Sequence, residues 1–301
     1  MLSKAVKDAW AAWIKVTRER CHLHFEIEGN DLKSHVTAGH RTGLHCASRV
    51  KNDIANVVPE KILEIGCSVG FNCLGLAERY PQALITGIEP DGEACVVASS
   101  MADYFGLKNV RFIQGIGESL PFPDESYDLI VCHTVIEHVN DVETCIKEMA
   151  RILRAGGVAH IEAPNYIWPW EPHLGIAMPP LCPKPIMRFL AKLQGASAHV
   201  TYAEHLKLVH PAWIERCFLA CGLKWTNRVE AKFQNASEGN NTDIVAYGRL
   251  AKIFKILHAM KLSGLAIYIL LRLRLYPSLL YTAYKQPGAE KSLWNYTCDS
   301  T

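Results

Sequence analysis

The chain has 301 residues, 49% of them hydrophobic, which is enough to bury the core of one α/β domain with additions. Its 32 Lys and Arg residues nearly balance 30 Asp and Glu residues, and the resulting net charge of +2 excludes an overall electrostatic surface for nucleic acid. The 11 cysteines are odd in number and form no Cys-x-x-Cys pair, so a reduced, cytoplasmic setting is favoured over a disulfide framework.

Residues 1–58 are expected to form a helical N-terminal cap. Val6, Trp10, Trp13 and Ile14 fall near one helical face, and charged residues interrupt the segment, so no secretory signal is expected. We expect this face to pack over the core or over a cofactor. The histidines between positions 22 and 45 match no standard ligand spacing, and no metal site is expected.

Residues 61–72, Lys-Ile-Leu-Glu-Ile-Gly-Cys-Ser-Val-Gly-Phe-Asn, predict a buried strand, a tight glycine turn and the start of a helix. The apolar run is typical of a parallel strand that is covered on both faces. Gly66 and Gly70 carry no Cβ, so the backbone can approach a ligand closely, and free N–H groups at the helix start can face that ligand. The turn therefore predicts a site for a nucleotide-like ligand.

The following segments alternate between strands and helices. Residues 83–89 form an apolar run that ends in Glu89, at the spacing of a second βαβ strand, where its carboxylate can accept hydrogen bonds from two ribose hydroxyls. Further strands are expected at 110–114, 127–133 and 158–163, with a helix at about 141–153 that stops at the glycines of 154–157.

In this order and spacing the chain resembles the class I S-adenosylmethionine-dependent methyltransferases, and among them the ubiquinone/menaquinone-biosynthesis branch (methyltransferase type 11). The matching blocks are Leu-Glu-Ile-Gly-Cys-Ser-Val-Gly (63–70), Glu89, Gly-Glu-Ser-Leu-Pro-Phe (117–122), Tyr-Asp-Leu-Ile-Val (127–131), Ile-Glu-His-Val (136–139) and Leu-Arg-Ala-Gly-Gly (153–157). The resemblance implies a Rossmann-like, doubly wound seven-stranded sheet with a cofactor-binding core at 59–165. A NAD-type fold is the alternative, but Phe71-Asn-Cys follows Gly70 without that fingerprint's third glycine or alanine.

S-adenosylmethionine is the cofactor that the resemblance implies. Glu64 and the glycine loop would contact its amino-acid part, Glu89 its ribose, and residues 116–119 its adenine. Ser68 stands where the family usually has a second loop glycine, and a serine can fit there if its backbone angle is ordinary. Ile116 stands where an acid often contacts the adenine amino group. Backbone groups and Glu118 would then hold that base. The full expected set is Glu64, Gly66, Cys67, Ser68, Gly70, Glu89, Pro90, Ile116, Gly117, Glu118 and His133.

Residues 166–210, rich in aromatics and prolines, leave the carboxyl end of the fifth strand and are expected to form a substrate lid. A loop that only covers the sheet edge is the alternative. Candidate substrate-binding residues are Asn165, Tyr166, Trp168, Trp170 and Glu171. Candidate catalytic bases are His133, His138 and His173, although His138 could instead cap the next helix. Residues 211–250 are expected to complete the sheet with a helix at 211–221 and antiparallel strands at 223–229 and 243–247.

The segment 251–301 is expected to be a basic amphipathic extension. Residues 244–289 contain no Asp or Glu but seven Lys and Arg, and the uncharged run 262–271 is too short to span a bilayer. Peripheral binding to an anionic membrane through residues 249–285 is therefore predicted, with packing on the chain's own domain or in a homodimer as the alternative.

The predicted function is methyl transfer from S-adenosylmethionine to a small or lipid-linked acceptor. An oxygen acceptor is preferred because histidine bases are available and no acidic pair marks an amine site. The alternative is a catalytically silent cofactor-binding or membrane-tethered scaffold protein of the same fold.

Overall fold

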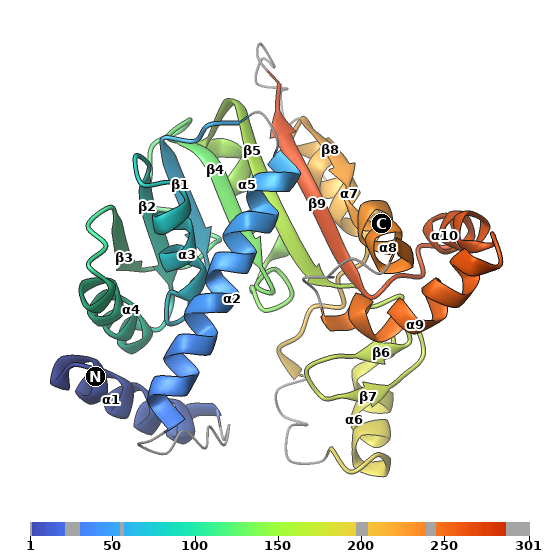
Figure 1. The fold of residues 1–301 in the computed structure, drawn as a ribbon, viewed down its shortest axis with the longest axis horizontal. Coiled ribbons are helices and arrows are strands. Elements are labelled where there is room, and N and C mark those ends of the chain that lie inside the picture. The colour runs from blue at the N-terminus through green and yellow to red at the C-terminus, as the bar shows by residue number, and fades with distance from the viewer. Residues whose placement is uncertain (1, 22–30, 55–56, 197–203, 239–244, 287–301) are drawn as a thin grey trace, which may run out of the picture.

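A computed structural model describes residues 2–21, 31–54, 57–196, 204–238 and 245–286. At its centre is a seven-stranded sheet in the order β3-β2-β1-β4-β5-β9-β8 (Figure 1). Its strands are β1 (Lys61–Ile65), β2 (Leu84–Glu89), β3 (Val110–Gln114), β4 (Tyr127–His133), β5 (Leu153–Pro164), β8 (Leu223–Asn227) and β9 (Ser278–Lys285). Neighbouring strands are parallel except where β9 runs antiparallel to β5 and β8. The predicted doubly wound seven-stranded α/β fold is confirmed.

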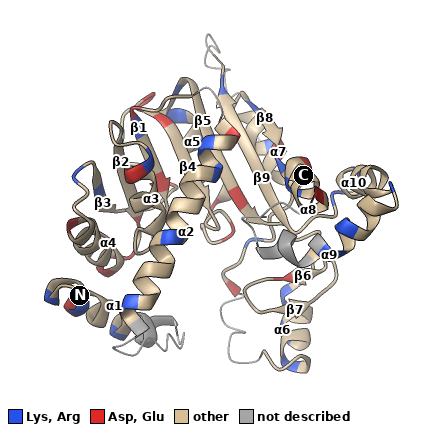
Figure 2. Ribbon diagram, in the orientation of Figure 1, with Lys and Arg blue, Asp and Glu red and all other residues tan. Residues whose placement is uncertain are grey.

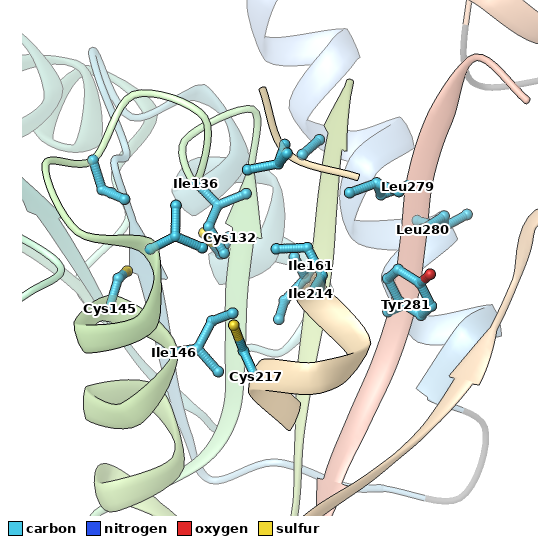
Figure 3. Packing of buried hydrophobic residues seen from close by; sticks show 14 of the residues in the cluster. Cys132, Ile136, Cys145, Ile146, Ile161, Ile214, Cys217, Leu279, Leu280 and Tyr281 are labelled. Atoms are coloured by element: carbon cyan, nitrogen blue, oxygen red, sulfur yellow. The ribbon is translucent and has the colours of Figure 1, made fainter. Parts of the chain in front are cut away.

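Helices cover both faces of this sheet. The helices α2 (Asp31–Ile54), α3 (Phe71–Arg79) and α4 (Gly92–Phe105) lie on one face, and α5 (Val142–Ile152) and α7 (Pro211–Ala220) on the other (Figure 1). Alternate residues of one strand serve the two layers, since Ile62 packs with residues of α2 and α3 while Leu63 packs with those of α5 and α7. Figure 3 shows the second layer, where side chains such as Ile146 and Cys217 meet the sheet. Burial on both faces explains the continuous apolar runs of the parallel strands.

The predicted N-terminal cap is helical. Helix α1 (Lys4–Cys21) packs against α4, with Val6, Trp10 and Trp13 buried as predicted. Helix α2 crosses α3 at unusually short range, because a Cβ atom on Gly43 would lie 1.9 Å from the carbonyl oxygen of Phe71. Glycine is required at this crossing, and the close approach lets α2 reach far across the sheet.

Two expected boundaries are wrong. Helix α5 ends at Ile152, and Leu153 is already extended, so the glycines of 154–157 lie in β5 and not at a helix stop. The second antiparallel strand was expected at 243–247. Of these residues, 243–244 lie outside the described part of the chain, and 245–247 begin helix α9 (Val245–Ala259). A short apolar run does not distinguish a strand from a helix, and β9 completes the sheet instead.

The segment expected as a basic C-terminal extension therefore divides into two parts. Helices α8 (Val229–Glu238), α9 and α10 (Ser263–Arg272) form an insertion between β8 and β9, whereas residues 278–283 are buried in the sheet. The lid segment contains a short ribbon of β6 (Trp170–Glu171) and β7 (Ile176–Ala177), followed by α6 (Lys184–Leu193). Among the described residues, no helix combines the length and apolar character needed to cross a bilayer.

Candidate functional site

The glycine turn follows β1 at the carboxyl edge of the sheet. Gly66 and Gly70 have φ angles of 68° and 85°, in the left-handed region that glycine tolerates. Ser68 also lies in this region, with φ 47°, so the condition of an ordinary backbone angle, under which a serine was expected to fit, is not met. Its backbone N–H donates to the Glu89 carboxylate at 2.9 Å, and this bond offsets part of the backbone strain.

Two predicted carboxylates stand on either side of this loop. Glu89, at the end of β2, accepts hydrogen bonds from the N–H groups of Ser68 and Asp91. Glu64 is buried within β1 and accepts from Asn72 Nδ2 at 2.8 Å and Cys73 Sγ at 2.9 Å. Burial raises the pKa of Glu64 to about 7, with the hydrogen bonds from the thiol and amide opposing it. Glu64 thus fixes the start of α3, and Glu89 stands beside the loop.

The residues expected near adenine follow β3. Ile116 is 42% exposed, whereas Gly117 is buried, and a Cβ atom there would lie 2.8 Å from Cys145 Sγ. Glu118 accepts from the backbone N–H of Asn140 at 2.6 Å and so ties this loop to the start of α5. The predicted cofactor residues that follow β1, β2 and β3, including buried Cys67 and exposed Pro90, therefore share one edge of three adjacent strands. Ligands bind open α/β sheets at this edge, where the strand order reverses beside β1.

A chain of ionisable side chains begins at the end of β4. His133 Nε2 lies 2.7 Å from Nδ1 of His160 on β5, and His160 Nε2 lies 3.0 Å from the Asp53 carboxylate on α2. The other ring nitrogen of His133, Nδ1, lies 3.4 Å from both Cys46 Sγ and Arg49 Nη2. We call His133, His160 and Asp53 the histidine relay.

Electrostatics fix the charge states of the histidine relay. Burial lowers the pKa of His133 well below 6.5, and the nearby positive charges of His160 and Arg49 lower it further. Burial also lowers the pKa of His160, although its hydrogen bond to Asp53 opposes the shift. Burial alone would raise the pKa of Asp53, but the hydrogen bond and the charge of His160 outweigh it, and the net shift is downward. Both imidazoles are therefore neutral and Asp53 is ionised near neutral pH.

Sequence reasoning named His133 but missed the rest of the relay. Two features could have revealed it. Cys46, Arg49 and Asp53 are spaced three and four residues apart, which places them on one face of α2. His160 and Glu162 interrupt the otherwise apolar strand β5, and Glu162 lies 2.7 Å from Arg49 as a buried ion pair. Polar residues in a buried strand call for a specific partner.

The other two predicted bases, His138 and His173, meet at a separate cluster with Glu137. The Nε2 atoms of His138 and His173 lie 3.8 and 3.7 Å from Glu137 Oε1, and their rings meet edge to face at 5.1 Å. His173 Nδ1 lies 2.6 Å from Glu171 Oε1. Burial raises the pKa of Glu137 to about 7 and lowers that of His138 to about 4. The predicted bases thus form two groups, one around His133 and one around Glu137.

A small cavity of about 150 Å³ lies between the end of the sheet and the lid. It is lined by Thr134, Glu162, Ala163, Pro164, Trp168, Trp170, Pro172, Pro277 and Ser278. Two of the predicted substrate-binding residues, Trp168 and Trp170, are among them. The other three lie in the supporting structure: Asn165 donates to the carbonyls of Arg274 and Tyr276, while Tyr166 is buried and donates to Glu171.

Comparison with known proteins identifies the central segment. Residues 63–161 match the family model of a methyltransferase domain. The chain is 42% identical over 97 residues to the uncharacterized methyltransferase YcgJ of Bacillus subtilis. This alignment covers 32% of this chain and 38% of YcgJ. It is 30% identical over 152 residues to ajmaline N-methyltransferase of Rauvolfia serpentina, or 48% of this chain and 50% of that enzyme. It is 31% identical over 100 residues to demethylmenaquinone methyltransferase of Geobacillus stearothermophilus, an alignment that covers 33% of this chain and 43% of that enzyme.

The chain thus spans half or less of the length of these curated relatives. The crystal structure of YcgJ is similar over 81% of this chain and 99% of its own, with a TM-score of 0.50 and 20% identity, which shows a shared fold. The family match covers β1 to β5 with the glycine turn and Glu89. Residues 63–161 therefore form a methyltransferase domain of the class I, S-adenosylmethionine-dependent family.

Proposed function

We propose that this chain is an S-adenosylmethionine-dependent methyltransferase that acts on a small or lipid-linked acceptor. The observation that carries the proposal is the arrangement at the carboxyl edge of the sheet. The glycine turn and Glu89 lie on the β1 and β2 side, and the histidine relay and the lid cavity lie on the β4 and β5 side. A cofactor site and an acceptor site thereby adjoin at the point where the strand order reverses.

The cofactor fits the residues present. Gly66 and Gly70 let the turn approach a ligand. Within the described part of the chain each Glu89 oxygen accepts one backbone hydrogen bond, which leaves a lone pair on each for ribose hydroxyls. When bound, S-adenosylmethionine supplies an activated methyl group on a sulfonium, so the protein contributes mainly placement and proton removal.

Hydrogen-bond directions support His133 as the base for an oxygen acceptor. The ionised Asp53 can only accept, so His160 donates its Nε2–H to it and accepts at Nδ1. His133 must then donate its Nε2–H to His160, which leaves Nδ1 as the proton acceptor. His133 Nδ1 faces Arg49 Nη2 and Cys46 Sγ at 3.4 Å, so an alcohol must displace these two contacts before it can transfer its proton to this nitrogen. The positive charge formed would then be stabilised along the relay by Asp53.

Calorimetric titration with S-adenosylmethionine and its demethylated product tests cofactor binding. We expect Glu89→Gln to weaken binding at least tenfold because the ribose acceptor loses its charge. Glu93→Gln is the matched control, since Glu93 is an exposed carboxylate in the first turn of α4. Failure of the unaltered chain to bind either compound would defeat the enzyme proposal, and binding without methyl transfer to any acceptor would favour the scaffold alternative.

Kinetics of His133→Asn and Asp53→Asn test the relay. Both substitutions should lower kcat by about 10²- to 10⁴-fold, because the first removes the base and the second its charge stabilisation. Full turnover with an unchanged pH profile in His133→Asn would remove His133 from the mechanism.

A lipid-linked acceptor is supported by apolar side chains that stand in solvent near basic ones. On α9 and α10, Ile256 is 62% exposed and Tyr268 61%, and on α6 Leu193 is 72% exposed. Figures 1 and 2 show α6 and α9, with their Lys and Arg residues in blue, on the same side of the molecule as the lid ribbon β6–β7. Basic residues interleaved with exposed apolar ones favour the surface of an anionic membrane.

Flotation with vesicles of anionic and of neutral lipid tests this surface. Truncation after Arg249 would remove β9 from the sheet, so point substitutions are needed. Ile256→Glu combined with Leu265→Glu should abolish recovery with anionic vesicles, while Leu219→Glu on α7, 70% exposed in the unaltered chain, should not. Equal recovery of all variants would contradict the membrane proposal. A dimer in solution that the first pair of substitutions dissociates would instead favour packing against a second copy.

A further inference from the structure

The cluster of Glu137, His138 and His173 has the composition of a metal site. Glu137 and His138 lie on the loop after β4, and His173 lies in the lid ribbon between β6 and β7. We propose that these three side chains bind a divalent first-row transition-metal ion. This inference goes beyond methyl transfer, which needs no metal, and it assigns to His138 and His173, expected from the sequence as bases, a role as metal ligands.

Distances in the cluster suit coordination better than hydrogen bonding. One ligand atom from each residue lies within 4.8 Å of the others. The contacts of Glu137 Oε1 with the two histidine nitrogens, 3.7 and 3.8 Å, are too long for hydrogen bonds. Ligand atoms held about 2.1 Å from a tetrahedral ion lie about 3.4 Å apart, so an ion would need only small inward movements of these side chains.

The Glu137 carboxylate supplies an independent reason for a cation. Its side chain is fully buried, and neither oxygen has a hydrogen-bond partner among the described residues. A buried carboxylate without hydrogen bonds carries a large desolvation cost. The contacts of 3.7 and 3.8 Å with the two histidines offset this desolvation cost only in part. An ion coordinated to Glu137 and both histidines would offset more of it.

Glu171 orients one of the ligands. Its Oε1 accepts the hydrogen bond from His173 Nδ1, which leaves the lone pair of Nε2 on the side of Glu137. The backbone N–H of Leu174 and the hydroxyl of Tyr166 hold Glu171 in turn. A carboxylate that fixes the tautomer of a ligating histidine is the usual outer partner in metal sites. Glu171 does not line the acceptor cavity, and a role in orienting His173 accounts for its burial.

The ligand types limit the ion. Two imidazoles and one carboxylate suit zinc, manganese, iron(II) or cobalt, whereas calcium and magnesium prefer oxygen ligands. Three protein ligands leave at least one position open. Thr134 and Pro172 line the acceptor cavity and belong to the two segments that supply the ligands. An oxygen of the acceptor is the group that would fill the open position.

Equilibrium dialysis of the chelator-treated full chain against Zn²⁺ or Co²⁺ tests the proposal, and Co²⁺ adds a visible absorption spectrum. We expect one equivalent of metal. Glu137→Gln, His138→Asn and His173→Asn should each weaken binding at least 100-fold, and Glu171→Gln about 10- to 100-fold. His258→Asn is the matched control, because His258 is exposed on α9.

Circular dichroism and cofactor titration of each variant separate lost metal binding from lost folding. His138→Asn is the decisive variant, since its side chain is 29% exposed and its replacement disturbs packing least. Absence of stoichiometric metal in the unaltered chain would overturn the proposal, as would equal affinity of all variants. The binding measurement does not depend on an acceptor, so its failure is distinct from failure of the methyltransferase proposal.

Discussion

The neutral state of His133 makes the fold sensitive to acid. Unfolding frees this imidazole to bind a proton with an ordinary pKa of 6.5, whereas burial holds its pKa well below that value in the folded chain. Below pH 6.5 the unfolded state therefore binds a proton that the folded state does not, and the free energy of unfolding falls as the pH falls. Between pH 7.5 and 5.5 the unfolded imidazole becomes largely protonated while the buried one stays neutral, which corresponds to roughly 1 kcal/mol.

Urea unfolding of the unaltered chain and of His133→Asn at the two pH values measures this term. Titrating groups distant from His133 contribute to both proteins and cancel in the difference to first order, whereas its hydrogen-bond partner His160 does not. We expect the unaltered chain to lose roughly 1 kcal/mol more than the variant between pH 7.5 and 5.5. The exposed-site control His258→Asn should behave like the unaltered chain. Equal losses in His133→Asn and the unaltered chain would refute a buried, neutral His133.

Three further predictions concern stability. Gly43→Ala should cost about 1–3 kcal/mol, because its Cβ would collide with the Phe71 carbonyl, while Gly264→Ala, which meets no atom within 4 Å, should be harmless in the same urea titration. Ser68→Gly should add about 0.5–1 kcal/mol by relieving its left-handed φ; a loss of stability would argue against that angle. Asp128→Ala should cost about 2 kcal/mol, since the carboxylate accepts from two backbone N–H groups, and an unchanged melting temperature would contradict those bonds.

Sequence reasoning worked best for the parallel half of the sheet. The runs at 110–114 and 127–133 match β3 and β4 residue for residue. The strand β4 is buried and therefore apolar, and the edge strand β3 is separated from its neighbours by clear helix and turn signals. The antiparallel half was harder. Leu279, Leu280 and Tyr281 are as apolar as any core strand, but they follow two basic helices, and the sequence alone predicts them as a continuation of that extension. Pairing with β5 and β8, both distant in sequence, makes this segment a strand.

The candidate site was predictable only in part. The glycine turn and Glu89 are local features with a fixed spacing, so one stretch of sequence contains them. Arg49 and Asp53 were missed because charged residues on a helix normally face solvent, and here the glycine crossing of α2 with α3 brings them over the sheet. His138 meets His173 because of the path that the lid segment takes, and the sequence spacing of the two histidines does not predict this path.

The position of β9 has a consequence for how the protein is made. Thr282 pairs with His160 and accepts from Arg228, whose guanidinium also bonds the carbonyl of Asp53. During synthesis the ribosome releases β1 to β5 long before β9, so the nascent chain must hold an open β5 edge until residue 285 has emerged. Asp53, His133 and His160 are all synthesised before β9, so the support that Thr282 and Arg228 give to the histidine relay is added last, when the sheet is complete.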